Sequence, residues 1–274
     1  MYLINGQASE TLSVHDRGLH YGDGLFETLA VQNGTPLCWD KHYRRLALGC
    51  KRLQFDCPQS DLLLAESRQL AGNTPLLVLK IITTRGEGGR GYRPEPGTPV
   101  TRILGVFPWP SHPQKNYTEG VNLRLCKTRL GKNPDTAGIK HLNRLEQVLA
   151  RGEWDNPEIA EGIMRDTDDN IIEGTMSNIF LIKDNGLLIT PDLTNCGITG
   201  VIRENILALA PDIGFKTIIK NVSETDLYSA DEIFLCNSVI GLWPVAAIEE
   251  HEFRPGPGTG RIRNVLVSHR IIVQ

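Results

Sequence analysis

The stretch Gly138-Ile139-Lys140-His141-Leu142-Asn143-Arg144-Leu145-Glu146-Gln147-Val148-Leu149-Ala150 follows a run of turn-forming residues and continues in an apolar pattern of helical period. From Leu142 onward, Leu142, Leu145 and Leu149 fall on one stripe, which predicts an amphipathic helix with one buried face. Lys140 precedes this helix. A lysine at such a junction most often lies in water, whereas a desolvated lysine has a lowered pKa and serves as a nucleophile or Schiff-base former. The rest of the chain must decide between these two roles.

Bulk composition limits the classes to which the protein can belong. Its 274 residues are 40% hydrophobic and 22% charged, which is ordinary for a globular protein. A net charge of −3 gives no basic field for nucleic acid, and no apolar run approaches the roughly 20 residues that span a membrane. The N-terminus lacks the layout of a signal peptide. We therefore predict a cytoplasmic protein with no nucleic-acid or membrane partner.

The cysteines and histidines favour neither disulfides nor a metal site. Six cysteines are scattered without a CxxC pair, which predicts reduced thiols. Seven histidines show no HxH or HxxxH spacing, so no metal site is predicted. The chain also lacks the GxGxxG and P-loop patterns of nucleotide sites.

A proline-rich segment divides the chain. Pro108-Trp109-Pro110-Ser111-His112-Pro113 holds three prolines in six residues, which is typical of a linker. We predict a smaller N-terminal α/β domain at residues 1–107, a linker at 108–113, and a larger C-terminal domain at 114–274 that carries Lys140. Trp109 in this linker either packs in the interface between the domains or forms the wall of a pocket.

The N-terminal part alternates strand and helix patterns. Strands are predicted at 2–4, 25–31, 75–84 and 101–107, and helices from an Asp40 cap to about Leu53 and at 59–71. Turns are predicted at Asn5-Gly6 and Asn33-Gly34, with another at Asn185-Gly186 in the C-terminal part. Arg45 lies at the edge of the buried stripe of the first helix. Such an arginine is usually a surface residue, but it could reach an anion across a cleft.

The segment Arg85-Gly86-Glu87-Gly88-Gly89-Arg90-Gly91-Tyr92 follows the strand at 75–84. Four glycines in eight residues favour a loop with unusual backbone angles. It is either a solvated loop or a gate over an anionic ligand.

The C-terminal part holds a carboxylate in an apolar setting. Strands are predicted at 159–164, 171–182, 215–219 and 231–236, and Glu173 lies inside the second of them. Glu173 either faces water at a sheet edge or is buried with a cationic partner, because an unpaired buried charge is costly.

A second helix start resembles an anion site. Thr199, within Gly197-Ile198-Thr199-Gly200, is a good N-cap for a helix to about Ala210. The backbone N–H groups of such an entry are suited to a phosphate, although a plain cap is more common. Ser238 follows the last predicted strand and could add a hydroxyl contact.

Together these features describe one site. A junction lysine, a carboxylate in a sheet, a helix start and an arginine for the same anion fit pyridoxal 5'-phosphate, which needs a Schiff-base lysine, an acidic partner for its ring nitrogen and a phosphate cup.

The whole chain resembles the fold-type IV pyridoxal-phosphate enzymes, the class of branched-chain aminotransferases, D-amino-acid transaminases and 4-amino-4-deoxychorismate lyases. The class marks are Tyr21-Gly22-Asp23-Gly24-Leu25-Phe26-Glu27-Thr28, His42 with Arg45-Leu46, Glu173 with Ser177-Asn178-Ile179-Phe180, and Gly197-Ile198-Thr199-Gly200 with Arg203. The segments at 85–92 and 137–146 are similar to those of the lyases.

The resemblance implies a fold and roles for single residues. The expected fold is α/β (α+β), with two domains, the cofactor between them and a homodimer. Lys140 would bind the cofactor covalently, and Glu173 would pair with its ring nitrogen. The phosphate would be held by Arg45, the backbone of Ile198 and Thr199, and Ser238.

The resemblance also implies a reaction on a small-molecule substrate. The lyases convert 4-amino-4-deoxychorismate to 4-aminobenzoate and pyruvate in folate biosynthesis. The alternative is an aminotransferase of branched-chain or D-amino acids that uses the same site. Because the lyase substrate is a flat carbocycle, we expect Tyr92 and Trp109 to line its pocket.

Overall fold

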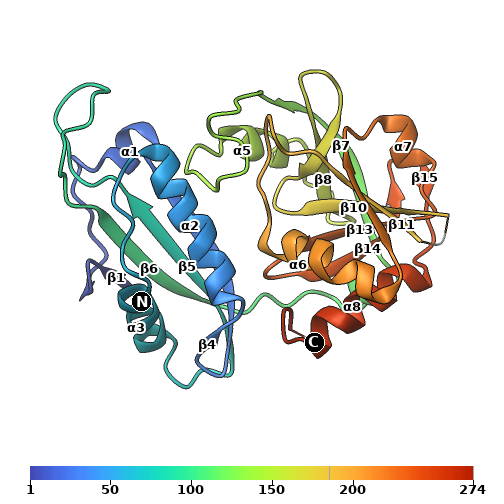
Figure 1. Ribbon diagram of the computed structural model, residues 1–274, viewed down its shortest axis with the longest axis horizontal. Coiled ribbons are helices and arrows are strands. Elements are labelled where there is room, and N and C mark those ends of the chain that lie inside the picture. The colour runs from blue at the N-terminus through green and yellow to red at the C-terminus, as the bar shows by residue number, and fades with distance from the viewer. Residues whose placement is uncertain (185, 274) are drawn as a thin grey trace. The chain divides into compact units, whose positions relative to one another are not determined.

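The protein has an α+β fold in two compact units, each built on a mixed or antiparallel sheet (Figure 1). The computed structural model describes residues 1–184 and 186–273. Unit 1 comprises Met1–Pro110 and Ile139–Asn143, and unit 2 comprises Ser111–Gly138 and Arg144–Gln274. The chain therefore passes from one unit to the other inside the proline-rich segment.

Lys140 groups with unit 1, which differs from its predicted place in the C-terminal domain. The reason is backbone pairing. Phe26 N donates to Lys140 O at 2.9 Å, and Leu142 N donates to Gly24 O at 3.0 Å. Ile139 is buried in the apolar core of the same unit.

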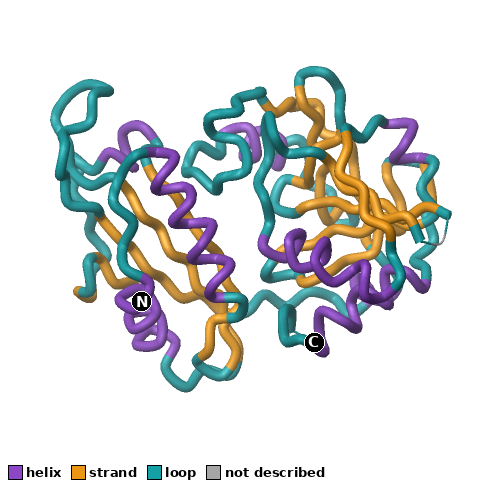
Figure 2. Tube along the Cα trace, in the orientation of Figure 1, coloured by secondary structure: helices purple, strands orange, loops and turns teal. Residues whose placement is uncertain are grey.

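Unit 1 is a six-stranded antiparallel sheet with three helices (Figure 2). The strand order is β2-β1-β6-β5-β3-β4. The strands are β1 (Tyr2–Ile4), β2 (Gln7–Ala8), β3 (Gly24–Gln32), β4 (Thr35–Pro36), β5 (Leu76–Thr84) and β6 (Thr101–Pro108). The helices are α1 (Arg17–Tyr21), α2 (Trp39–Leu53) and α3 (Ser60–Ala71). The strand and helix predictions for this part are thus confirmed within a few residues.

The two faces of this sheet differ. On β3, Leu25, Glu27 and Leu29 are buried, and the apolar ones pack with residues of α2 and α3. Phe26 and Thr28 alternate with them and are half-buried on the other face. The alternation places Glu27 and Phe26 on opposite sides of one strand.

The cap of α2 differs from its prediction, and two turns of unit 1 agree with theirs. The cap of α2 is Cys38 rather than Asp40, which lies in the first helical turn, where its charge still suits the helix dipole. The turns at Asn5-Gly6 and Asn33-Gly34 join β1 to β2 and β3 to β4. The turn predicted at Asn185-Gly186 includes a residue outside the described part of the chain.

Unit 2 is a nine-stranded mixed sheet of order β12-β11-β10-β13-β14-β7-β8-β9, with β15 paired to β14. Its strands are β7 (Val121–Leu130), β8 (Ile159–Asp166), β9 (Ile171–Gly174), β10 (Asn178–Lys183), β11 (Leu187–Pro191), β12 (Lys216–Lys220), β13 (Glu232–Asn237), β14 (Gly241–Ile248) and β15 (His251–Glu252). Its helices are α4 (Lys115–Thr118), α5 (Leu145–Arg151), α6 (Val201–Leu209), the 3-10 turn η1 (Ala210–Ile213), α7 (Glu224–Tyr228) and α8 (Pro257–Ser268).

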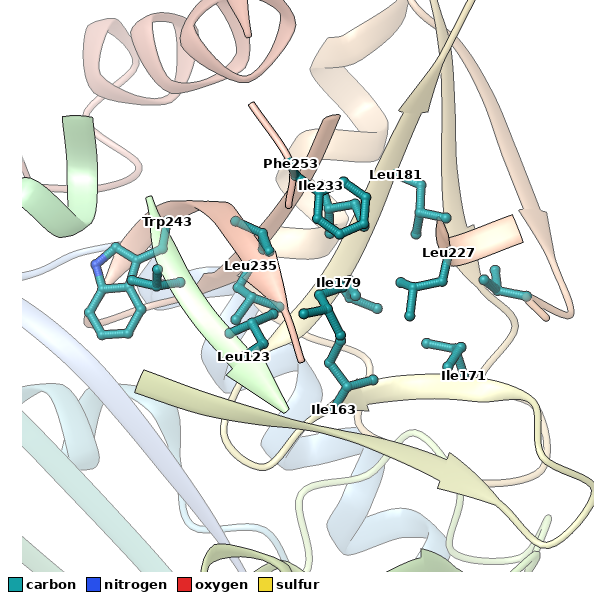
Figure 3. Close-up of a cluster of buried hydrophobic side chains, with 14 of the residues drawn as sticks. Leu123, Ile163, Ile171, Ile179, Leu181, Leu227, Ile233, Leu235, Trp243 and Phe253 are labelled. Atoms are coloured by element: carbon teal, nitrogen blue, oxygen red, sulfur yellow. The ribbon is translucent and has the colours of Figure 1, made fainter. Parts of the chain in front are cut away.

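Both faces of the central strands of unit 2 are buried. On β10, Ile179 and Leu181 belong to the apolar cluster in Figure 3, whereas Phe180 and Ile182 belong to a second cluster with residues of α6 and α8. This explains the unbroken apolar sequence of β10, since a strand covered on both sides needs no polar face.

The helix predicted from Leu142 is wrong in its start and in its buried face. It begins at Leu145, because the preceding residues pair with β3. Its buried residues are Gln147 and Ala150, whereas Leu145 is 76% exposed and Leu149 is 64% exposed. The apolar stripe of α5 is therefore an exposed apolar surface of unit 2.

Candidate active site

Lys140 lies against the sheet of unit 1, and not at the start of a solvated helix. Its Nζ is 4.3 Å from the centroid of the Phe26 ring. Phe26 also pairs with the Lys140 backbone. An ammonium over an aromatic face is attracted by the ring quadrupole, so the Phe26 ring is one contact of the Lys140 amine.

A second lysine lies at the same ring, and sequence analysis missed it. Lys80 Nζ is 5.4 Å from the Phe26 centroid. The pairing of Lys80 with Thr28 and of Ile82 with Phe26 puts Lys80 on the face of Phe26. Among the described residues, Lys80 has no carboxylate within ion-pair distance. The signal was a lone lysine inside an apolar strand.

Arg45 is held by a buried carboxylate. Its Nε donates to Glu27 Oε1 at 2.8 Å and its Nη2 to Glu27 Oε2 at 2.6 Å. His42 Nδ1 donates to Glu27 Oε2 at 2.6 Å. Burial raises the pKa of Glu27, but the Arg45 guanidinium and the His42 ring outweigh burial and lower it to about 2. Burial lowers the pKa of His42, and its contact with Glu27 opposes that shift.

Glu173, on β9, is buried at 3% exposure. Its Oε2 accepts from Ile198 N at 2.8 Å, and Asn178 Nδ2 lies 3.4 Å away. The same Asn178 Nδ2 donates to Ile198 O at 2.9 Å. Arg144 is its cationic neighbour: burial lowers the pKa of Arg144, and the charge of Glu173 opposes that shift. Of the two roles left open by the sequence, Glu173 therefore takes the buried one with a cation nearby.

The predicted phosphate donors Ile198 N and Thr199 N have protein acceptors in this structure. Ile198 N donates to Glu173, and Thr199 N donates to Gly138 O at 3.0 Å. Thr199 is also not the cap of α6, because Gly200 is the cap residue. The backbone N–H groups of the first turn of α6, beginning with Val201, have no acceptor within the helix. They point outward from the N-terminal end of α6. The first turn of α6 therefore offers N–H groups beside the predicted loop amides of Ile198 and Thr199.

Gly138, which precedes Lys140 by two residues in the sequence, is paired with the segment that carries Ile198. Gly138 forms a parallel bridge with Ile198, and Gly138 N donates to Gly197 O at 2.9 Å. Within unit 2, the Gly138 end of this loop is therefore tied to the same backbone that donates to Glu173.

Ser238 follows the last residue of β13 directly and is half-buried. Cys236 on β13 pairs with Asn178 on β10, which puts Ser238 at the same end of the sheet as Asn178. Asn237 fixes the turn, since its Oδ1 accepts from Val239 N and Ile240 N at 2.8 Å each.

Tyr92 and Trp109 follow opposite ends of the sheet of unit 1, and their predicted place in the substrate pocket stays a prediction. Thr84 pairs with Gly24, and the loop with Tyr92 starts at that end. Ile103 lies level with Phe26 through Ile82, and Pro108 is about 17 Å further along β6. Trp109 comes after Pro108. Only Tyr92 therefore shares the end of the sheet where Lys140 is docked.

The chain is similar to known enzymes of one family over most of its length. The family model for amino-transferase class IV matches residues 24–248. An aminodeoxychorismate lyase from Vibrio harveyi is 34% identical over 252 residues, which cover 92% of this chain and 93% of that protein. The crystal structure of 4-amino-4-deoxychorismate lyase from Pseudomonas aeruginosa is similar with a TM-score of 0.95 and 44% identity, over 99% of this chain and 100% of that one. A branched-chain-amino-acid aminotransferase from Salmonella typhimurium is 29% identical and covers 93% of this chain and 87% of that protein.

Proposed function

Because the chain belongs to the class IV aminotransferase family, we propose that it is a pyridoxal-phosphate-dependent lyase that converts 4-amino-4-deoxychorismate to 4-aminobenzoate and pyruvate. One observation carries the substrate assignment: relatives named for this reaction match nearly the whole chain at higher identity than the aminotransferase does. The product, 4-aminobenzoate, would serve folate biosynthesis, and cysteines that form no disulfide among the described residues suit a cytoplasmic enzyme.

The residues fit this cofactor. Lys140 offers an amine for its aldehyde carbon, and Glu173 offers a buried carboxylate for its ring nitrogen. Arg45, Thr199, Ser238 and the first turn of α6 offer a cation, hydroxyls and N–H groups for its phosphate. Gly197 supports the fit, because a Cβ there would lie 2.8 Å from Ile172 Cγ2 and 3.3 Å from Glu173 Oε2, so a side chain would intrude on the carboxylate.

Each residue then has a chemical task. When bound, pyridoxal phosphate draws electrons from the substrate carbon that carries nitrogen. Lys140 Nζ, released when the substrate amine takes its place on the cofactor, would remove the proton from that carbon and return a proton to the departing enolpyruvyl group, which would leave as pyruvate. Glu173 would keep the ring nitrogen protonated, and Ile198 N–H and Asn178 hold the Glu173 carboxylate in place. Loss of the ether leaves an aromatic ring, which drives the reaction forward.

Two further groups support a substrate with carboxylates. Lys80 is a cation near Lys140 without a carboxylate partner among the described residues. Tyr92 is exposed at the same end of the sheet. We propose that Lys80 binds a substrate carboxylate and that Tyr92 contacts the substrate ring.

The test is product formation from 4-amino-4-deoxychorismate. Appearance of pyruvate and 4-aminobenzoate in equal amounts supports the lyase. The second candidate is an aminotransferase, which the Salmonella typhimurium relative favours. Glutamate formed from an amino acid and 2-oxoglutarate, without either lyase product, would establish it instead.

The exposed apolar stripe of α5 supports a homodimer. Leu145, Val148 and Leu149 are each more than 60% exposed, and soluble proteins usually cover such clusters. We propose that a second copy of this chain covers them. Light scattering on the purified protein decides between a dimer and a monomer.

A further inference from the structure

Arg17 is a buried arginine whose donors go to the backbone of a distant loop. It is 5% exposed. Its Nη1 donates to Gly91 O at 3.1 Å and its Nη2 to Tyr92 O at 2.9 Å. Its Nε donates to Asp23 Oδ2 at 2.9 Å, and its guanidinium carbon lies 4.8 Å from the centroid of the Tyr21 ring. The planar fork of arginine suits such a set of fixed acceptors, whereas a lysine ammonium does not.

The loop held by Arg17 displays an aromatic ring to solvent. Tyr92 is 85% exposed, although its own carbonyl is fixed by a buried charge. Gly91 N donates to the Tyr21 hydroxyl at 3.2 Å, and the rings of Tyr21 and Tyr92 lie 5.4 Å apart. Burying a cation is costly unless its donors are satisfied, and here they are satisfied by the backbone that carries an exposed tyrosine. The arrangement fixes the base of Tyr92 and leaves its ring available.

The opposite end of the segment 16–24 joins the Lys140 segment. Asn143 Nδ2 donates to Gly22 O at 3.1 Å, and Leu142 N donates to Gly24 O. Arg85 is also part of the support, because it donates to Asp23 and to the carbonyls of Leu53 and Gln54. Arg85 therefore braces the start of the loop, since its donors go to protein acceptors.

We propose that Arg17 is a positioning residue that sets the place of Tyr92 relative to Lys140 and so tunes substrate binding; this inference rests on the proposed function. Arg17 does not touch the substrate. It acts by binding the carbonyls of Gly91 and Tyr92. The Tyr92 ring then meets the substrate in one position, and fewer conformations of the loop are lost on binding.

The first test needs no substrate. Arg90 is exposed on the same loop, so trypsin cleavage after Arg90 reports how often the loop opens. Arg17→Met should raise that cleavage rate roughly tenfold or more, because it removes charge-assisted bonds to two carbonyls. Arg17→Lys should behave like Arg17→Met. Arg102→Met is the matched control, since Arg102 is an ion-paired arginine of the same unit that binds Glu66. An unchanged rate in Arg17→Met, or an equal rise in Arg102→Met, would overturn the proposal.

The second test is a double-mutant cycle on kcat/KM with 4-amino-4-deoxychorismate. Arg17→Met should lower kcat/KM roughly tenfold, mainly through KM, and should have little further effect in a Tyr92→Ala background. Equal losses in both backgrounds would mean that Arg17 acts on the fold and not through Tyr92, and would overturn the proposal. If the unaltered protein releases no pyruvate, the proposed function fails, and the trypsin comparison still decides whether Arg17 holds the loop.

Discussion

Glu27 and Arg45 form a buried ion pair with two contacts, Nε to Oε1 at 2.8 Å and Nη2 to Oε2 at 2.6 Å. Glu27 lies on β3 and Arg45 on α2, so the pair fastens the helix to the sheet. It also orients the guanidinium that we propose for the cofactor phosphate. Removing one partner would leave the other charge buried, which is strongly destabilising.

This pair predicts a loss of stability in acid. The pKa of Glu27 is lowered from 4.5 to about 2, so ionised Glu27 stabilises the fold above pH 4.5, and that contribution is lost as the pH falls toward 2. It amounts to roughly 3 kcal/mol. The lowered pKa of His42 acts in the same direction, because protonation of His42 favours the unfolded chain. Urea unfolding at pH 7, 5 and 3.5 measures the effect. Glu27→Gln should have a lower free energy of unfolding at pH 7, but this free energy should fall less between pH 5 and pH 3.5 than in the unaltered protein. An equal fall in both proteins would contradict this.

Glu173→Gln should keep the cofactor bound and lower kcat by roughly a thousandfold or more. The amide oxygen still accepts from Ile198 N–H, so the local structure persists, but an amide cannot keep the ring nitrogen protonated. Stopped-flow rates and cofactor titration separate the two effects.

Glu232→Gln is a control for Glu173→Gln. Glu232 is another buried carboxylate of unit 2, at the far end of β13 from Ser238, and it accepts from Gly258 N and Thr259 N. It should lose stability and retain kcat. Near-normal turnover in Glu173→Gln, or an equal loss in Glu232→Gln, would refute the assigned role.

Lys80→Met should raise the KM for 4-amino-4-deoxychorismate about tenfold, because a charge-assisted contact to a carboxylate is worth roughly 1.5–3 kcal/mol. Lys80→Arg should recover part of the affinity. Lys51→Met, an exposed lysine of α2, makes the same change in net charge and should have no effect. If Lys80→Met, Lys80→Arg and Lys51→Met all keep the KM of the unaltered protein, Lys80 does not bind the substrate.

Local pattern predicted most elements but not what covers them. The strand predicted at 75–84 corresponds to β5, because a short run of apolar and β-branched residues favours a buried strand over a helix or a loop. The stripe of α5 is real as a pattern, yet Leu145 and Leu149 are exposed, since periodicity shows that residues share a face and not what packs on it. Lys80 was missed because its place beside Phe26 follows from the pairing of β3 and β5, which no local pattern encodes.

Site residues divide in the same way. Glu173 was found because a carboxylate in an apolar strand is unusual. The acceptors of Ile198 N and Thr199 N were not foreseen, because they depend on Glu173 and Gly138, which are distant in sequence. Trp109 was predicted to line the substrate pocket from its residue type and its place in the linker, and the register of β5 and β6 places it at the end of β6 opposite to the end that lies level with Gly24.

Trp109→Ala should therefore lower stability and leave the kinetics per folded molecule unchanged. Trp109 is half-buried beyond the end of β6, so truncation removes apolar contacts worth about 1–3 kcal/mol. Tyr92→Ala should give the opposite result, because an 85% exposed side chain contributes little to the fold while its ring is available to the substrate. Thermal unfolding and kcat/KM measured on both variants form a crossed comparison. A raised KM with an unchanged Tm in Trp109→Ala would contradict this expectation and would show that Trp109 contacts the substrate.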